Sequence, residues 1–354
     1  MLYQTENQHG GDVYGGGITL DFSANTNPLG TPPGVLEAVC RALPRLHRYP
    51  DPYCRRLVQA IAGHEQVPAS YILCGNGAAD LIYTYCAALR PRTAVELAPT
   101  FVEYGAGLAQ VGCHVERYFL HQAQNFDLDE RFLSLLEEKK PEVVFLCNPN
   151  NPTGRLIPLP LLEQILQYCA AQGARLFLDE CFLDLTEDGV SAKSLLAAHP
   201  ELLILKAFTK SYGMAGIRLG YCLCADNALL RRMAAASPPW NVSTPAQSAG
   251  VAALAERDFL QRTLSLVRTE RRWLTDNLTA LGFWVCPSHA NYLLFRGPLG
   301  LREGLLQQGI AIRGCGNYNG LGDGWYRIAV RPHGENEALI TAIRQFCKEK
   351  ALWQ

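Results

Sequence analysis

A lysine and an arginine near the middle of the chain have the residue types and spacing that most favour chemistry. Lys210 follows the apolar run 202–208, and Arg218 lies eight residues further on, in the segment Gly-Ile-Arg-Leu-Gly. A lysine at the mouth of a buried strand is desolvated, so its pKa should fall and its amine should become a usable nucleophile. An isolated lysine at a strand end more often points into solvent, so this interpretation depends on other residues.

Polar residues also follow other predicted strands. The turn Gly75-Asn-Gly77 joins a strand to a helix that begins at Ala78, where free N–H groups favour an anion. Asp179 ends a wholly apolar strand, and a buried carboxylate there is costly unless it meets a cation. The loop 148–154 carries side-chain amides, including that of Asn151, which can donate to an oxyanion. Ligands of parallel α/β sheets bind at the carboxyl ends of the strands, so we expect these residues to meet.

Arginines late in the chain form a second candidate group. Arg327 and Arg331 lie four residues apart on one predicted strand, so both are expected on the same face. Two guanidinium groups there suit bidentate capture of carboxylate or phosphate, and Arg313, at the end of the preceding strand, is placed to join them. Earlier in the chain, Arg218 and Thr209 suit a phosphate group, through a charge and a hydroxyl donor.

The elements that must position these residues alternate between helix and strand. Strands separated by helices imply parallel pairing with right-handed crossovers, hence a mostly parallel sheet covered by helices on both faces. Tyr104, one turn into a predicted helix, is a candidate to stack on a planar ligand, although half-buried packing explains it equally well. The predicted strands are 71–74, 93–97, 114–119, 143–147, 176–178, 202–207 and 220–224, and the predicted helices are 55–63, 78–89, 102–111 and 160–172.

After residue 227 the pattern changes to long helices followed by short strands. This predicts a smaller α+β domain, with a helix at about 260–281 as the bridge to it. The predicted division is an N-terminal arm with part of the small domain at 1–45, a large ligand-binding domain at 46–252 and a small C-terminal domain at 253–354.

Composition limits the class of protein. The 354 residues are 48% hydrophobic and 18% charged with a net charge of -1, which suits about two globular domains and disfavours a nucleic-acid surface. The start resembles no signal peptide, and no apolar run approaches the ~18 residues of a membrane span, so we expect a cytoplasmic protein. The 13 cysteines show no paired metal-site spacing, which predicts free thiols, a reducing compartment and no metal.

Together these motifs resemble pyridoxal phosphate (PLP)-dependent enzymes of fold type I, in the class I/II aminotransferase family. The matching segments are Asn-Pro-Thr-Gly154, Leu-Asp179-Glu, Thr-Lys210 and Gly-Ile-Arg218-Leu-Gly. The segment 48–51, Arg-Tyr-Pro-Asp, resembles the histidinol-phosphate aminotransferase group. Closer still are the threonine-phosphate decarboxylases of cobalamin synthesis, over nearly the whole chain. The segments that carry this likeness are 9–11, 21–30, 75–77, 239–241, 290–294, 317–321 and 326–331.

The resemblance implies a role for each matching residue on the cofactor. It makes Lys210 the Schiff-base lysine and Asp179 the partner of the pyridine nitrogen, both catalytic. Asn151 falls on the position that binds the ring hydroxyl oxygen, and Tyr104 on the stacking aromatic. The implied cofactor-phosphate positions are Gly77, Ala78, Thr209 and Arg218, joined by Tyr49 from a second subunit, so a homodimer with a shared active site is expected.

The resemblance also implies how a substrate is held. Arg327 falls on the arginine that binds the substrate carboxylate. The further candidates for holding the substrate phosphate or fixing its carboxylate are His9, Asn25, Asn151, Arg313 and Arg331.

Two positions depart from the family pattern. Aminotransferases of this branch usually carry Tyr where this chain has Phe182, so one donor to the ring oxygen is absent, which fits a decarboxylase better than a transaminase. A phosphate-binding Ser or Thr is usual where this chain has Ala207, so phosphate anchoring is expected to rely more on Thr209 and Arg218.

The activity implied is decarboxylation of L-threonine O-3-phosphate to (R)-1-aminopropan-2-yl phosphate and carbon dioxide, with serine phosphate as a second candidate substrate. The alternative is a histidinol-phosphate or aromatic amino acid aminotransferase, which shares every cofactor residue. The His9-Gly-Gly arm and Phe182 favour the decarboxylase. A non-catalytic binding protein of the same fold is disfavoured because it would lack the lysine, and Lys210 is present.

Overall fold

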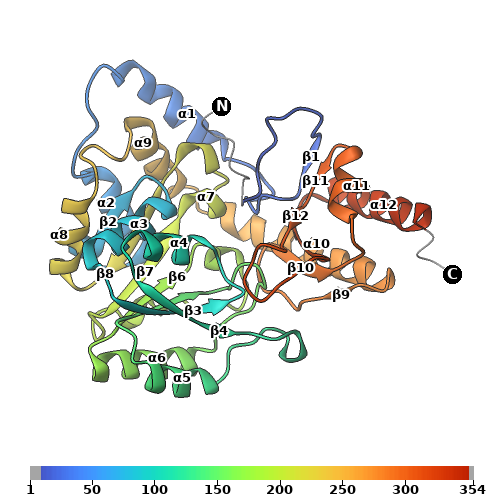
Figure 1. Cartoon of the computed structure of the whole chain (residues 1–354). Helices are drawn as coiled ribbons and strands as arrows, with labels where there is room; N and C mark the ends of the chain where they lie inside the picture. The colour runs from blue at the N-terminus through green and yellow to red at the C-terminus, as the bar shows by residue number, and fades with distance from the viewer. Residues whose placement is uncertain (1–8, 351–354) are drawn as a thin grey trace.

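A seven-stranded sheet and a four-stranded sheet, joined by one long helix, organise residues 9–350, which the computed structural model describes (Figure 1). The seven-stranded sheet has the order β2-β8-β7-β6-β5-β3-β4. Its strands are β2 (Ile72–Gly75), β3 (Thr93–Ala98), β4 (His114–Phe119), β5 (Val143–Cys147), β6 (Arg175–Asp179), β7 (Leu202–Ala207) and β8 (Gly220–Cys224).

The prediction of a mostly parallel sheet is confirmed, with one reversed strand. Strands β3 to β7 pair in parallel, whereas β8 runs antiparallel to both β7 and β2. The connection 208–219 between β7 and β8 contains one turn of α-helix, α7 (Phe208–Ser211), and no crossover helix, so β8 returns alongside β7 in the opposite direction.

Helices cover both faces of this sheet because its inner strands are apolar on both sides. Val144 and Leu146 of β5 pack into one hydrophobic core, while Phe145 and Cys147 pack into the other. The helices of the first core are α2 (Arg55–Glu65), α5 (Arg131–Lys139), α6 (Leu159–Gln172) and α9 (Thr244–Ala253). Those of the second are α3 (Ala78–Leu89), α4 (Glu103–Gln110) and α8 (Asn227–Ala236).

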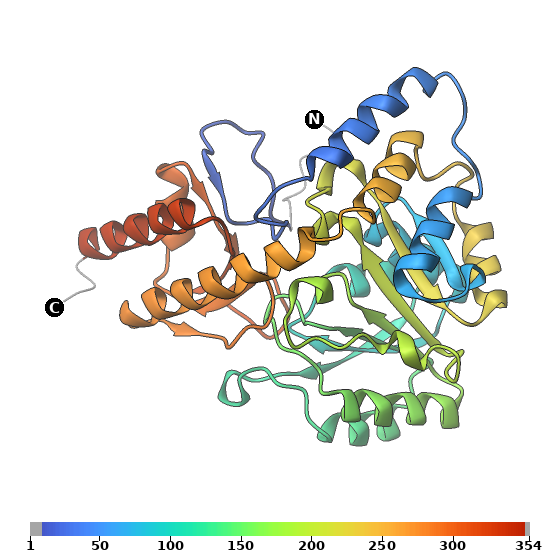
Figure 2. The ribbon, with the colours of Figure 1, turned by 180° about the vertical axis from the view of Figure 1, so that it is seen from behind.

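The long helix α10 (Phe259–Ala280) runs from the large sheet to the small one, as Figure 2 shows, close to the predicted bridge. The small sheet has the order β12-β13-β10-β9 and is antiparallel. Its elements are β9 (Trp284–Val285), β10 (Tyr292–Arg296), β12 (Arg313–Gly314) and β13 (Trp325–Ala329), with α11 (Leu301–Gln307) and α12 (His333–Glu349) packed beside them.

The single strand that was predicted to end at Arg313 is two strands in different sheets. β11 (Ile310–Ala311) pairs with β1 (Leu20–Asp21), and β12 pairs with β13, so the chain changes partner at Ile312. β1 thus ties the N-terminal arm to the small region, whereas α1 (Pro33–Ala42) packs against α9 of the large one. Within residues 9–350, no helix is long and apolar enough to cross a membrane.

Candidate active site

A cavity of about 370 Å³ lies where β5, β6 and β7 end and the small sheet faces the large one. The carboxyl ends of these parallel strands meet at one edge of the sheet, which is where polar residues were expected to converge. Ten of the predicted site residues line it: His9, Asn25, Ala78, Asn151, Asp179, Thr209, Lys210, Arg218, Arg313 and Arg327.

Lys210 projects into this cavity from α7, the turn that follows β7. Burial lowers the pKa of its ammonium group to about 8, and the positive charges of Arg327 and Arg218 contribute in the same direction. Its Nζ lies 5.4 Å from the centre of the Phe182 ring, at the position where the family resemblance implies a tyrosine. An amine with this pKa is partly neutral near pH 8 and can attack a carbonyl carbon.

Asp179 ends β6 and is 5% exposed. Burial raises the pKa of its carboxyl group, opposed by hydrogen bonds that Tyr104 Oη (2.6 Å) and the Cys181 backbone N–H (2.8 Å) donate to its two oxygens. The carboxylate is therefore fixed in orientation at the cavity wall, where a cationic ring nitrogen would compensate its burial.

The structure does not bear out Tyr104 as the stacking aromatic. Its ring is fully buried behind Asp179, 5.5 Å from the ring of Phe145, and it does not line the cavity. Helix α4 begins at Glu103, so its first turn directs Tyr104 into the core of the sheet. Phe101, in the turn before the helix, lines the cavity instead.

The N-terminus of α3 and Arg218 form the anion-binding end of the cavity. Gly77 caps α3 with a φ of +88°, and a Cβ added there would lie only 2.7 Å from Arg218 Nη2. The Arg218 backbone itself has a φ of +59°, an unfavourable conformation for a side-chain residue that places its guanidinium against this helix end. Ala78 and Thr209 line the same part of the wall.

Two arginines of the small sheet also line the cavity. Arg313 of β12 and Arg327 of β13 are paired across the antiparallel register. Arg327 donates from Nη2 to the Ser23 carbonyl (2.9 Å) and from Nη1 to Asn151 Oδ1, which links the small sheet to the loop after β5. Arg313 donates from Nη2 to Asn317 Oδ1 (2.7 Å).

Some polar atoms on this wall are buried without a partner. Among the residues that the structure describes, Asn25 Nδ2, Asn25 Oδ1 and Arg327 Nε are buried and make no hydrogen bond. Both side chains line the cavity, and Asn25 is 1% exposed. Buried polar groups are normally satisfied, so these atoms indicate where a polar ligand binds.

His9 enters the cavity from the N-terminal arm. Its Nε2 lies 2.7 Å from Glu103 Oε1, and Tyr83 Oη donates to the other oxygen of Glu103 (2.6 Å). Glu103 lines the cavity and was not predicted as a site residue. Its position at the start of a helix, next to the predicted Tyr104, is the feature of the sequence that could have identified it.

Two predicted residues lie elsewhere. Arg331 was expected beside Arg327 on the same face of one strand, but β13 ends at Ala329, before Arg331. The Nε of Arg331 pairs with Glu335 instead (2.8 Å). Tyr49 is 78% exposed and stacks on Trp240 with ring centres 4.5 Å apart. It lines a separate groove of about 470 Å³ with Arg45 and other arginines.

The donor set fits PLP. Lys210 supplies an amine for an aldehyde, Asp179 a buried carboxylate for a ring nitrogen, and the Gly77–Arg218 contact a cradle that a Cβ would fill. Asn151 reaches the same cavity, where its amide can donate to a ring oxygen.

Comparisons with known proteins agree with this fit. Residues 18–346 match the family "Aminotransferase class I and II". The chain is 41% identical to a threonine-phosphate decarboxylase of Salmonella typhimurium over 92% of this chain and 90% of that protein. A solved histidinol-phosphate aminotransferase of Clostridium acetobutylicum matches with a TM-score of 0.87 at 28% identity, covering 93% of this chain and 99% of that one.

A further solved structure carries the cofactor. The histidinol-phosphate aminotransferase of Sinorhizobium meliloti, in complex with pyridoxal-5'-phosphate, matches with a TM-score of 0.83 at 23% identity, over 93% of this chain and 92% of that one, a likeness of fold. The family match, the 41% identity and the site together show that this chain belongs to the PLP-dependent class I and II aminotransferase family.

Proposed function

We propose that the protein decarboxylates L-threonine O-3-phosphate to (R)-1-aminopropan-2-yl phosphate and carbon dioxide. The observation that carries the proposal is the cavity wall, where Arg313 and Arg327 lie side by side and the amide of Asn25 is unpartnered. Two guanidinium groups and an amide suit a small amino acid that bears both a carboxylate and a phosphate. The likeness to the Salmonella decarboxylase supports the same substrate class.

Bound PLP supplies an aldehyde that bonds to amines and a ring that withdraws electrons from the substrate Cα. Asp179 would hold the ring nitrogen with its negative charge and so favour the protonated ring. Arg327, which lines the cavity, would hold the substrate carboxylate and fix its orientation, so that the bond from Cα to the carboxylate is the one that breaks. Carbon dioxide leaves without the bonding electrons, and Lys210 delivers a proton to Cα in its place.

The second candidate is a histidinol-phosphate aminotransferase, which the Clostridium structure favours. That reaction needs the same lysine and carboxylate, so only the substrate wall and Phe182 separate the two. Phe182 packs edge to face on Tyr292 with ring centres 4.9 Å apart. Phenylalanine has no hydroxyl group, so this position supplies no donor to the ring oxygen of PLP. This departure supports the decarboxylase.

An assay of the purified holoenzyme separates the two candidates. We expect carbon dioxide from threonine phosphate without any added keto acid, and slower release from serine phosphate, because one methyl group changes pocket affinity by ~1–3 kcal/mol. Absence of carbon dioxide, together with transfer of the amino group of histidinol phosphate to 2-oxoglutarate, would reject the proposal in favour of the aminotransferase.

We also propose a homodimer in which Tyr49 of a second copy completes the phosphate end of the cavity. Tyr49 is exposed on its own chain and lies outside its own cavity. Mixing inactive Lys210→Ala protein with Tyr49→Ala protein after subunit exchange should restore activity, because a mixed dimer has one site with both side chains. No recovery in a sample shown to contain mixed dimers would contradict this shared site.

A further inference from the structure

The turn that carries Lys210 cannot hold itself in place. Helix α7 has four residues, which is too short for a stable helix. The position of the Lys210 amine therefore depends on contacts from outside the turn. Ser211, the residue directly after Lys210, receives two such contacts and is 1% exposed.

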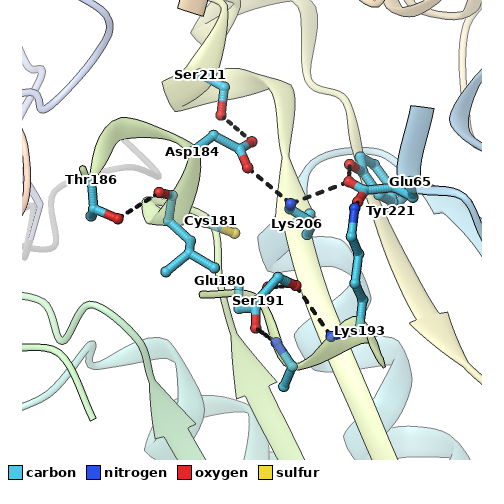
Figure 3. Close-up of polar contacts among 12 residues, drawn as sticks. Glu65, Glu180, Cys181, Asp184, Thr186, Ser191, Lys193, Lys206, Ser211 and Tyr221 are labelled. Atoms are coloured by element: carbon cyan, nitrogen blue, oxygen red, sulfur yellow. Dashed lines mark hydrogen bonds and ion pairs between the residues drawn. The ribbon is translucent and has the colours of Figure 1, made fainter. Parts of the chain in front are cut away.

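The first contact comes from Asp184 in the 3-10 turn η4 (Leu183–Leu185). Its Oδ2 accepts a hydrogen bond from Ser211 Oγ (2.9 Å), and its Oδ1 accepts one from Lys206 Nζ (2.9 Å). Figure 3 shows the carboxylate lying between these two side chains. Lys206 lies in β7, before Lys210, and Ser211 lies in α7, directly after Lys210. The carboxylate of Asp184 therefore bonds to the chain on both sides of Lys210.

Lys206 is itself held firmly. It is 4% exposed, and its Nζ also lies 3.2 Å from Glu65 Oε1. Glu65 accepts further bonds from Tyr221 Oη and from Lys193 Nζ (2.8 Å), on two other elements (Figure 3). Burial alone would raise the pKa of Glu65, but Lys206, Lys193 and Tyr221 lower it to about 2. The anchor for Asp184 is thus a charged cluster tied to the body of the large sheet.

The second contact comes from the N-terminal arm. Asn27 donates from Nδ2 to the Ser211 carbonyl (2.8 Å) and to Thr263 Oγ1 (2.9 Å). Thr31 Oγ1 donates to the Gly213 carbonyl (2.8 Å), and Gly213 has a φ of +62°, where a Cβ would lie 2.6 Å from the Gly30 oxygen. Asn27 stands two residues after Asn25, so the arm that lines the cavity also holds the lysine turn.

We propose that Ser211 is the positioning residue for Lys210, held at its hydroxyl by Asp184 and at its carbonyl by Asn27. The proposal rests on the role of Lys210 given above. Through Ser211 the backbone of Lys210 keeps one place while its side chain moves between cofactor and substrate. Misplacement of a reacting group by about 1 Å can cost as much as ~100-fold in rate, so a hydroxyl that touches no ligand affects turnover.

Ser211→Ala is the sharpest test because it leaves the partly buried Asp184–Lys206 ion pair intact, whereas breaking that pair risks unfolding. Ser191→Ala is the matched control. The hydroxyl of Ser191 also donates to a buried carboxylate, Glu180 Oε2 (2.6 Å), but Ser191 lies away from Ser211 (Figure 3). Both variants lose one such bond, and only one of them touches the turn.

In the holoenzyme we expect Ser211→Ala to lower kcat with threonine phosphate by between about 10-fold and 100-fold, with KM changed less than about twofold. The midpoint of the pH titration of the visible cofactor band, which reports the surroundings of the Lys210 nitrogen, should move by about half a unit or more. Ser191→Ala should leave both unchanged, and Ser211→Thr, which keeps the hydroxyl, should recover most of kcat if it folds.

An unchanged kcat or an unmoved titration midpoint in folded Ser211→Ala would overturn the proposal, as would an equal loss of kcat in Ser191→Ala. The titration needs no substrate. If the wild-type holoenzyme releases no carbon dioxide from threonine phosphate, the proposed function fails, and the titration of Ser211→Ala against Ser191→Ala still decides the role of Ser211.

Discussion

Asp179 and Asn25 both line the cavity, and their polar atoms are satisfied in opposite ways. On the cofactor side, both oxygens of Asp179 accept hydrogen bonds from the protein. On the substrate side, Asn25 Nδ2 and Oδ1 and Arg327 Nε have none within the described residues. Under the proposed function, the cofactor side is therefore organised before any ligand arrives, whereas the substrate side is completed by the ligand. Changes on the first side should remove activity, and changes on the second should weaken binding.

Replacing Lys210 tests the cofactor side most severely. Lys210→Ala removes the amine whose pKa is lowered to about 8, so we expect release of carbon dioxide from threonine phosphate to fall by more than about 10³-fold. The visible absorbance near ~420 nm should disappear with it. Lys348→Ala, at an exposed position of α12, is the control and should behave as wild type.

The two late arginines test the substrate side as a matched pair. Arg327 lines the cavity, whereas Arg331 pairs with Glu335 outside it. We expect Arg327→Ala to lower kcat/KM by about 100-fold or more, since it removes a buried charge from its partners, and Arg331→Ala to change it by less than about threefold. Steady-state kinetics of both proteins decide this, and equal losses would contradict the assignment of the walls.

The pH dependence of cofactor capture tests the readiness of the cofactor side. The pKa of Lys210 is lowered from 10.5 to about 8, so its neutral fraction rises as the pH rises through about 8. Capture of PLP by the cofactor-free protein, followed by absorbance, should be about tenfold faster at pH 9 than at pH 7 and level off above that. A rate that keeps rising to pH 10.5 would show an ordinary lysine.

Replacing Asn25 should have the smallest effect of these changes, and it should alter only the binding of substrate. Asn25→Ala removes two unpartnered atoms of the cavity wall, so we expect KM for threonine phosphate to rise by about fivefold, the worth of roughly one hydrogen bond. Equilibrium titration with PLP should give unchanged cofactor affinity. A loss of PLP binding instead would mean that the two sides are not independent.

Residues at strand ends were predictable from sequence, and residues within turns were not. Asp179 and Lys210 each close an apolar run, and their place follows from where parallel strands end. The direction of a side chain at the start of a helix does not follow from spacing. Tyr104 was therefore expected to line the cavity, which Phe101 lines instead, and the Tyr104 hydroxyl donates to Asp179.

The substrate side depends on pairing between distant segments, which local pattern does not contain. Arg313 lies opposite Arg327 because the chain changes sheets at Ile312, within what the sequence indicates as one strand. Arg331 was misplaced because the strand ends at Ala329. The contact of Asn27 with Ser211, 184 residues apart in the chain, has no local signal in the sequence.

The reversed direction of β8 determines which loops of the large sheet lie near the cavity and which can be engineered. Because β8 runs opposite to β7, the segment before it carries Arg218 to the cavity, and the segment after it reaches the far edge, where Asp226 pairs with Arg175 at the start of β6. Insertions, affinity tags or fused domains placed at that far edge meet no cavity residue. The loop between β7 and β8, by contrast, carries both Lys210 and Arg218 to the cavity, so it is a poor place for an insertion.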